Sequence, residues 1–449
     1  MNVNLTFLTI AFVICVVNGT LLPHDPNYCY SSGDPQNFLA KFSTITQYDA
    51  VKGGSALNPS SCEPIKLLAL VRHGTRRPTS TEINFMLKNY SLIPGEIIDN
   101  INLGTTMLCE DDANTLKEWQ FDSNLLYPSG GLSLYGIEEM KNIAQRLKNT
   151  FRTLFLNSNS TLFRHSPSER TRQSAKAFAE GLYGSYAEVT FTNSGSEPDM
   201  LLQSFENCAT WKYTLQPLAI MDADNFTIGQ EFVNLEEHVN KKLGFTTGLK
   251  RLNRLDILAL VLHCMYEQIL NRTQNSPFCA AFSPSDMQIT EYYLDLLQFY
   301  LSGYGFPLYK NLYRNMNCEL VKNMLDFLTG TATENERLFF GHDTTMQFLF
   351  VALGVFKDDY PMTANNFAQQ SFRKWRPSLN TPMAATLVIV RYRCPAGDED
   401  EVLLELNELP LKFPGCNAEG ICKLSVFLKK LDYFAKANCA KLFCTNKTS

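Results

Sequence analysis

The chain of 449 residues has no internal repeat, no low-complexity segment and no run of like charge long enough to form a charged tail. These absences exclude a repeat array and a largely disordered protein. The formal net charge of -5 excludes a protein that binds nucleic acid through a broad basic face. A small anionic partner is compatible with this charge, because a few arginines in one pocket can dominate the local potential.

Long apolar runs are absent beyond the first twenty residues, so we expect no transmembrane helix and no membrane insertion. Leu5–Val17 is an apolar run of the length found in secretory signals, and Val17-Asn18-Gly19 supplies small residues for cleavage. The run is short for a membrane anchor. We therefore interpret residues 1–19 as a signal peptide, although no Lys or Arg precedes the run. The C-terminus carries neither a retention signal nor a lipid-anchor tail, so we expect a secreted, extracellular protein.

The sequence also lacks C-x-x-C pairs and His/Cys clusters with zinc spacing, and we expect no metal site and no other cofactor. It has 13 cysteines, of which Cys15 lies in the predicted signal. The remaining even number is typical of disulfides in an oxidising compartment. Their pairing stays open, but one group is expected to staple the C-terminal end: Cys416, Cys422, Cys439 and Cys444. Asn-x-Ser/Thr motifs predict N-glycosylation at Asn89, Asn159, Asn225, Asn271 and Asn446.

Strand-like and helix-like patterns alternate in the first part of the chain. The continuous apolar run Leu67–Val71 predicts a buried parallel strand. Further strands are expected at 161–163 and 188–192, and amphipathic helices at 135–155 and 171–182. This alternation predicts an α/β fold with a mainly parallel sheet and helices on both faces.

Strand signals are sparse from residue 193 to residue 285, where 252–270 is strongly helical. We expect a mostly helical cap over 193–289, inserted into a core formed by 20–192 and 290–449. In the second part of the core, a helix is expected at 289–300, a strand at 337–340 and a helix at 346–353 that stops at Gly354. Strands at 385–392 and 402–406 predict a hairpin that adds an antiparallel edge to the sheet.

Two predicted strands each deliver a histidine into a polar cluster, although the chain has only 6 histidines. The first is followed by Arg72, His73 and Arg76, and the second by His342 and Asp343. Open α/β folds place their sites at this edge of the sheet. Taken alone, each element has a simpler interpretation, such as a charged turn or a helix cap. The combination at strand ends favours a functional site.

These residue types fit the cleavage of a phosphomonoester. Planar guanidinium groups can grip phosphoryl oxygens in pairs, which suits Arg72, Arg76 and Arg170. A neutral imidazole such as His73 can attack phosphorus, and a carboxylic acid such as Asp343 can protonate the leaving oxygen. We interpret His165 as structural or peripheral, and His263, which lies in an apolar helix, as a core histidine.

The segment Arg72-His73-Gly74-Thr75-Arg76-Arg77-Pro78 resembles the R-H-G-x-R-x-P signature of the histidine acid phosphatases. Gly341-His342-Asp343-Thr344-Thr345 resembles the second motif of that family, and Ser168-Glu169-Arg170 is similar to the segment that supplies its third phosphate-binding arginine. The resemblance covers nearly the whole mature chain. Residues 28–71, 356–358 and 406–411 are most similar to the multiple inositol polyphosphate phosphatase subgroup.

This resemblance implies a phosphoglycerate-mutase-like α/β domain with a helical cap, and a phosphohistidine intermediate. It makes His73 the nucleophile and Asp343 the proton donor, and it assigns phosphate binding to Arg72, Arg76, Arg170 and His342. Two positions depart from the subgroup and from phytases. The second motif is His-Asp where the subgroup usually has His-Ala-Glu, and Ser80 stands where phytases often place a lysine.

The sequence thus favours a secreted phosphomonoesterase that hydrolyses inositol polyphosphates of the phytate type. A broad acid phosphatase acting on small phosphomonoesters is an alternative. A secreted binding protein on an inactive phosphatase scaffold is another, although none of the expected catalytic residues is missing. The expected partner is a small anionic phosphorylated substrate, and the sequence specifies no oligomeric state.

Overall fold

The computed structural model describes residues 21–34, 38–54, 61–90, 93–120, 122–195, 197–246, 250–271, 275–330 and 332–448. The predicted signal peptide lies outside these residues. In the described part, eight strands form one sheet in the order β3-β2-β4-β1-β5-β6-β7, and β8 pairs with β6. The strands are β1 (Glu63–Arg72), β2 (Thr161–His165), β3 (Phe191–Thr192), β4 (Glu336–Gly341), β5 (Thr386–Arg393), β6 (Glu401–Leu406), β7 (Leu409–Pro410) and β8 (Ile421–Lys423).

The four strands β3, β2, β4 and β1 are parallel to one another, whereas β5 pairs antiparallel with β1 and opens the predicted hairpin with β6. In the register, Arg72 pairs with Gly341 across β1 and β4, and His165 pairs with Phe340 across β2 and β4. The residues that follow these three strands therefore leave the sheet at the same side, where the carboxyl ends of the strands lie. This is where the sequence predicted the site.

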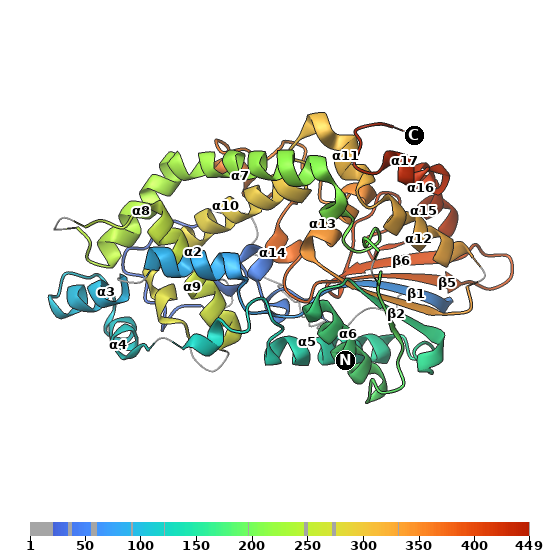
Figure 1. The fold of residues 1–449 in the computed structure, drawn as a ribbon, viewed down its shortest axis with the longest axis horizontal. Helices are drawn as coiled ribbons and strands as arrows, with labels where there is room; N and C mark the ends of the chain where they lie inside the picture. Colours follow the sequence, from blue (N-terminus) through green and yellow to red (C-terminus); the bar gives the residue numbers. More distant parts are fainter. Residues whose placement is uncertain are drawn as a thin grey trace, which may run out of the picture.

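Side chains of β1 alternate between two hydrophobic cores, as the pleat of a strand requires. Leu67, Ala69 and Val71 pack in one core with the pair α5 (Leu134–Thr150) and α6 (Glu169–Tyr183). Leu68 and Leu70 face the other core, which contains α12 (Cys318–Thr329) and α13 (Asp343–Leu353). Figure 1 shows these helix groups on opposite faces of the sheet. The predicted α/β fold with helices on both faces is confirmed.

A large helical part lies beside the sheet (Figure 1). It contains α7 (Gln216–Asp224), α8 (Gln230–Lys242), α9 (Arg254–Leu270) and α10 (Pro284–Ser302). Three helices from early in the chain lie there too, namely α2 (Ser80–Tyr90), α3 (Ile93–Asn102) and α4 (Glu110–Glu118), and α2 packs against α9. The helical layer therefore also draws on residues outside 193–289.

Shorter helices complete the described part of the chain. They are α11 (Lys310–Asn315), α14 (Pro377–Asn380), α15 (Leu424–Lys430), α16 (Asp432–Lys436) and α17 (Cys439–Leu442). No helix in the described ranges is both long enough and apolar enough to cross a membrane.

Six disulfides use every cysteine except Cys15: Cys29–Cys109, Cys62–Cys394, Cys208–Cys444, Cys264–Cys279, Cys318–Cys439 and Cys416–Cys422. The group near the C-terminus does staple that end, but only Cys416 and Cys422 pair within it. Cys439 and Cys444 reach back to α12 and to Cys208, so they tie the C-terminal helices to the body of the molecule.

Candidate active site

The two predicted motifs meet at the end of β1. The backbone N–H of His73 donates to the carbonyl of Gly341 at 3.1 Å, which continues the pairing of β1 with β4 by one residue. The rings of His73 and His342 then face each other edge to face, with their centroids 5.6 Å apart. Residues far apart in the sequence are thus brought together by the register of two parallel strands.

His73 is held as a neutral imidazole with one free ring nitrogen. Its Nδ1 lies 3.0 Å from the carbonyl oxygen of Gly74, and because a carbonyl only accepts, Nδ1 carries the proton. Nε2 is then left with its lone pair. The side chain is buried, and burial, followed by the nearby Arg72 and Arg170, lowers the pKa of His73 well below its usual range. A neutral ring with an available lone pair is the form that can act as a nucleophile.

Gly74 is required by a close approach of α5. A Cβ at this position would lie 2.5 Å from the carbonyl oxygen of Gly136, near the start of that helix. The N–H of Gly74 also donates to Ser174 on α6 at 3.1 Å. Both helices therefore fix the direction in which the backbone leaves β1, and with it the position of His73.

Arg72 is held from behind by backbone carbonyls. Its Nη1 donates to the carbonyl oxygens of Thr44 and Thr381, the latter at 2.7 Å, and its Nη2 lies 3.0 Å from Oδ2 of Asp343. Only 1% of the residue is exposed. Nε has no protein partner among the described residues. A buried donor without a partner points to a ligand that accepts a hydrogen bond there.

Arg76 is oriented by a carboxylate and a phenol. Its Nη1 donates to Glu82 Oε2 and to Tyr266 Oη, each at 2.9 Å, and Nη2 donates to Glu82 Oε1 at 3.3 Å. Tyr266 in turn donates to Glu82 at 2.7 Å. Burial opposes the charge of Glu82, but Arg76 and the hydrogen bonds prevail and lower its pKa to about 2. The ion pair therefore persists under acidic conditions.

Arg170 and His342 form the third side of the site. Arg170 Nη2 lies 3.3 Å from Nδ1 of His342, and because an arginine only donates, Nδ1 accepts. Nε2 of His342 lies 2.9 Å from Oγ of Ser166 and 3.0 Å from the side-chain amide nitrogen of Gln203. Burial, followed by Arg170, lowers the pKa of His342 to about 3. Nε of Arg170 has no partner in the described part of the chain, so a second guanidinium keeps an open donor.

Asp343 begins α13 with its carboxyl group beside Arg72. Its Oδ1 accepts from the N–H of Thr344 at 2.8 Å, and its side chain is 22% exposed. Burial raises the pKa of Asp343, but Arg72 and His342 outweigh this effect and leave the pKa below its ordinary value. The same carboxyl can therefore change its protonation state when an anion binds next to it.

Residues 65–406 match the histidine phosphatase superfamily (branch 2). The chain belongs to this superfamily. It is 32% identical over 432 residues to multiple inositol polyphosphate phosphatase 1 of Drosophila melanogaster, covering 93% of the chain and 90% of the relative. The predicted family is thus confirmed.

Solved structures share the fold of this histidine phosphatase. The phytase from D. castellii has a TM-score of 0.70 at 20% identity, covering 96% of this chain and 94% of that one. The multiple inositol polyphosphate phosphatase of Bifidobacterium longum, in complex with inositol hexasulfate, has a TM-score of 0.64 at 15% identity, covering 90% of this chain and 100% of that one.

The structure brings all six predicted site residues of the phosphatase together, and it adds four that sequence reasoning missed: Glu82, Tyr266, Ser166 and Gln203. The amide of Gln203 lies 3.0 Å from Nε2 of His342. A signal for Glu82 was present, since Thr79-Ser80-Thr81-Glu82 has the spacing of a capping box. Glu82 does accept from the N–H of Thr79, at 2.6 Å. No local pattern distinguishes Tyr266 or Gln203 from other helix and turn residues.

The other two histidines that were interpreted as structural are buried. His165 ends β2, with its Nδ1 2.7 Å from the carbonyl of Ser166. His263 lies inside α9, and burial lowers its pKa to about 3.

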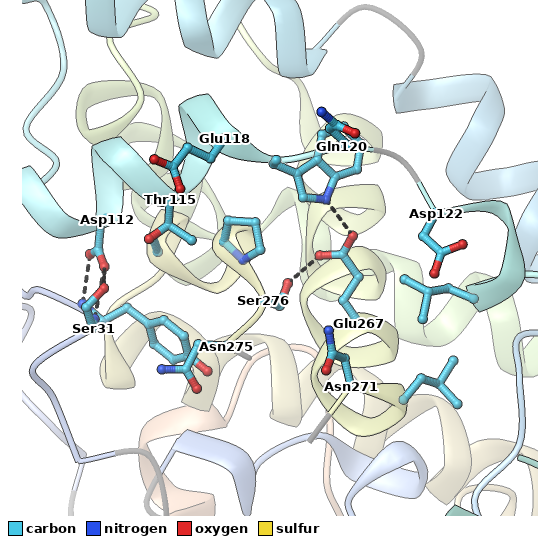
Figure 2. A pocket seen from close by; sticks show the side chains of 16 residues that line it. Ser31, Asp112, Thr115, Glu118, Gln120, Asp122, Glu267, Asn271, Asn275 and Ser276 are labelled. Atoms are coloured by element: carbon cyan, nitrogen blue, oxygen red, sulfur yellow. Dashed lines mark hydrogen bonds between the residues drawn. The ribbon is translucent and has the colours of Figure 1, made fainter. Parts of the chain in front are cut away.

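A separate cavity of about 800 Å³ is lined in part by α9, through Glu267, the residue that follows Tyr266 in the sequence. Figure 2 shows Glu267 in its wall, accepting from Trp119 Nε1 at 2.9 Å and from Ser276 Oγ at 2.7 Å. Among the described residues, the lining includes further carboxylates, Asp112, Glu118 and Asp122, and neither Lys nor Arg. These carboxylates repel a multiply charged phosphate ester, whereas the arginine cluster attracts one.

One histidine pair lies near a buried carboxylate away from the active site. Nδ1 of His238 is 3.0 Å and Nδ1 of His24 is 3.7 Å from Oδ1 of Asp286. The two rings stack with their centroids 3.4 Å apart and are nearly parallel. Lone pairs in parallel ring planes do not converge on one ion, so this geometry fits a hydrogen-bonded pair better than a metal centre.

Proposed function

We propose that this histidine phosphatase hydrolyses phosphomonoesters through a phosphohistidine on His73, and that inositol polyphosphates are its substrate class. The observation that carries the proposal is the convergence of three guanidinium groups around one neutral histidine. Nε of Arg72 and Nε of Arg170 are buried donors without an acceptor among the residues that the structure describes. The substrate class rests on the name of the Drosophila melanogaster relative, multiple inositol polyphosphate phosphatase 1.

In the first step, the lone pair on Nε2 of His73 attacks phosphorus and the P–O ester bond breaks. Arg72, Arg76 and Arg170 neutralise the charge on the phosphoryl oxygens, and His342, whose Nδ1 lies 3.3 Å from Arg170 Nη2, helps to bind the phosphate beside them. The carboxylic acid of Asp343 gives its proton to the leaving alkoxide. In the second step, water attacks phosphorus, the P–N bond breaks and Asp343 takes a proton from that water. Inorganic phosphate leaves, and both groups return to their starting state.

Substrate binding supplies the protonated form of Asp343. In the free enzyme Arg72 stabilises its carboxylate. A phosphate group on the same guanidinium adds negative charge beside Asp343, and a like charge raises the pKa of a carboxyl. Asp343 is therefore protonated most completely when the substrate is bound and the solution is acidic.

A second candidate function is a broad acid phosphatase that acts on small phosphomonoesters. The observation that favours it is Ser80, which bonds to Ser129 at the exposed start of α2 where phytases often carry a lysine. A serine hydroxyl offers less attraction to a distant phosphate than an ammonium group.

We further propose that the enzyme is secreted and glycosylated, and that the helical layer including 193–289 acts as a cap that shapes the substrate pocket. Six disulfides support an oxidising compartment. Asn159 and Asn225 are exposed and Asn271 is partly exposed, which is compatible with a glycan on each. Asn446 is exposed too, but its Nδ2 donates to the carbonyl of Leu308, and the side chain of Asn89 lies outside the described residues.

The test is phosphate release at acidic pH in the presence of a chelator, comparing inositol hexakisphosphate with p-nitrophenyl phosphate. Preference for the inositol ester supports the substrate class, and turnover of the nitrophenyl ester alone supports the second candidate. The control is His73→Ala, which is expected to fold and to retain less than about one part in a thousand of the activity. Folded, glycosylated wild-type protein that releases phosphate from neither ester would overturn the proposal.

A further inference from the structure

The guanidinium of Arg72 is clasped by two turns that come from distant parts of the chain. Thr44 lies in the single turn η1 (Ser43–Ile45), and Thr381 directly follows α14. Their carbonyl oxygens share Nη1 of Arg72. The turns also meet each other, because α14 packs against η1 and the N–H of Met383 donates to the carbonyl of Thr46 at 2.9 Å. We refer to η1 and α14, with Thr381, as the clasp.

Behind the clasp lies a buried ion cluster on α10. Glu291 and Asp295 are one helical turn apart, and Arg373 reaches both, at 3.2 Å and 2.6 Å respectively. Arg376 binds Glu291 at 2.9 Å. The side chains of the two carboxylates are 2% and 0% exposed. Charges this deeply buried are costly unless they are well paired, so the cluster has a fixed geometry.

Each carboxylate holds one turn of the clasp through a serine hydroxyl. Ser43 Oγ donates to Oδ1 of Asp295 at 2.9 Å, and Ser378 Oγ donates to Oε1 of Glu291 at 2.5 Å. Two routes of two hydrogen bonds each therefore connect α10 to Arg72. One runs from Asp295 to Ser43 and from the carbonyl of Thr44 to Arg72. The other runs from Glu291 to Ser378 and from the carbonyl of Thr381 to Arg72.

The backbone of the clasp is in a conformation that needs support. Ser43 has a φ of +48°, in the left-handed region that residues other than glycine rarely adopt. Ala384, three residues after the clasp, has a φ of +59°, and its N–H donates to the carbonyl of His73 at 3.0 Å. Such conformations persist only where surrounding contacts hold them, and the Ser43 hydroxyl supplies one of these contacts.

From this arrangement we infer that Asp295 and Glu291 on α10 are positioning residues for phosphate transfer. They hold the clasp so that Thr44 and Thr381 aim the Arg72 guanidinium at both the phosphate and Asp343. The inference rests on the proposed function. It adds to that function a link from α10 to the proton donor, because Nη2 of Arg72 lies 3.0 Å from Oδ2 of Asp343 and Arg72 is the strongest of the groups that lower the pKa of that carboxyl.

The test is Ser43→Ala, which removes one hydroxyl and leaves the ion pair of Asp295 with Arg373 intact. Loosening of Arg72 is expected to lower kcat for p-nitrophenyl phosphate about 5- to 20-fold and to weaken inhibition by inorganic phosphate, since small misplacements at a reacting centre are costly. The basic limb of the kcat/KM pH profile should move to higher pH, because a weaker contact with Arg72 lets the pKa of Asp343 rise.

Ser160→Ala is the matched control. Ser160 Oγ also donates to a carboxylate, that of Glu336, at 3.0 Å. Glu336 is the first residue of β4, whereas the site follows the last residue of that strand. Ser160 Oγ also donates to the carbonyl of Asn157 at 2.8 Å, so this variant loses at least as much hydrogen bonding as Ser43→Ala. Each variant should shift the folding equilibrium towards the unfolded state about 2- to 12-fold for each hydrogen bond lost, which is about 0.5–1.5 kcal/mol. Only Ser43→Ala should change phosphate inhibition and the pH profile.

Identical kinetics for Ser43→Ala and Ser160→Ala would overturn the inference. If Ser43→Ala does not fold, Ser378→Ala makes the same test through Glu291. Asp295→Asn keeps an oxygen that can accept from Ser43, so it should retain more activity than Asp295→Ala, whereas equal losses would contradict the positioning role. Failure of the proposed function is distinguishable, because it would appear as an inactive wild-type enzyme.

Discussion

At the scale of single residues, the site contains groups that stay charged during the reaction and one group that must change its charge. Arg76 and Glu82 form an ion pair that survives acid, whereas Asp343 sits between two opposing influences, burial and Arg72. His73 is neutral because burial and the arginines both disfavour a proton. The pH dependence of this phosphatase therefore reports Asp343 and the ionisation of the substrate.

We expect kcat/KM to fall with rising pH on the alkaline side, because only protonated Asp343 can serve the leaving group. The pKa of Asp343 in the free enzyme lies below its ordinary value, so a higher pH removes the active form. Asp343→Asn should slow hydrolysis of an inositol phosphate far more than that of p-nitrophenyl phosphate, whose leaving group scarcely needs a proton. Rates on both esters over a pH series measure this. A wild-type rate that climbs above neutral pH would contradict the assignment.

Glu82→Gln is expected to raise KM and lower kcat/KM about 10- to 100-fold, since Arg76 loses a buried charged partner.

In the wild type, the carboxylate of Glu82 has a pKa lowered from 4.5 to about 2. Its contribution to stability is therefore complete above pH 4.5 and is lost as the pH falls towards 2. The difference in unfolding free energy between the wild type and Glu82→Gln should therefore shrink as the pH falls from 4.5 towards 2, as unfolding measured at several pH values would show. A Glu82→Gln enzyme with an unchanged KM would show that Arg76 does not need this partner.

At the scale of elements, most of what the sequence predicted depended on local periodicity. The strand predicted at 67–71 lies in the C-terminal half of β1. The helices predicted at 135–155 and 171–182 are α5, which ends earlier at Thr150, and α6. The strand expected at 188–192 is shorter, because β3 pairs with β2 only through Phe191 and Thr192. Helix α4 escaped prediction because its sequence, EDDANTLKE, is mostly polar and buries only Asp112 and Leu116.

Local patterns also placed six site residues at strand ends, but they could not supply their partners. The Tyr266 and Arg76 side chains come together because α9 packs on α2, which is a tertiary contact. The clasp depends on the backbone carbonyls of Thr44 and Thr381, and a carbonyl has no sequence signature. Side-chain chemistry at a strand end is thus predictable, whereas support from the backbone and from other helices is not.

The first turn of α5 gives a prediction at this scale. A Cβ on Gly136 would lie 2.3 Å from the carbonyl oxygen of Thr75, so Gly136→Ala should push α5 away from the motif after β1. We expect a loss of about 1–3 kcal/mol, as for overpacking, together with reduced activity. The control is Gly95→Ala on α3, where a Cβ meets nothing within 4 Å and is expected to stabilise the helix by about 0.5–1 kcal/mol. Urea unfolding and activity assays measure both. Equal stability of the two variants would contradict the close approach.

At the scale of the whole molecule, disulfides tie together parts that lie outside the active site. Cys62 precedes β1 and pairs with Cys394, which follows β5. The site lies at the other end of β1, a strand of 10 residues. At about 3.3 Å per residue this is a separation of roughly 30 Å. The crosslink therefore stabilises the sheet without touching the chemistry.

Replacing both Cys62 and Cys394 with serine should cost about 2–5 kcal/mol of stability while leaving kcat within about twofold of the wild type. Denaturant unfolding and phosphate release on the same preparation give both quantities. The combination of unchanged stability with a tenfold loss of kcat would show that the crosslink acts on the site after all.

The strand order has a consequence for biosynthesis. β1 carries His73 but pairs with β4 and β5, which end at Gly341 and Arg393. A ribosome adding roughly 5–20 residues per second needs about 15–60 s to reach these partners after completing β1. During that interval the buried part of β1 has neither of its partner strands and must be shielded from aggregation, and His73 has neither His342 nor Asp343 beside it. Phosphatase activity is therefore among the last properties that the nascent chain acquires.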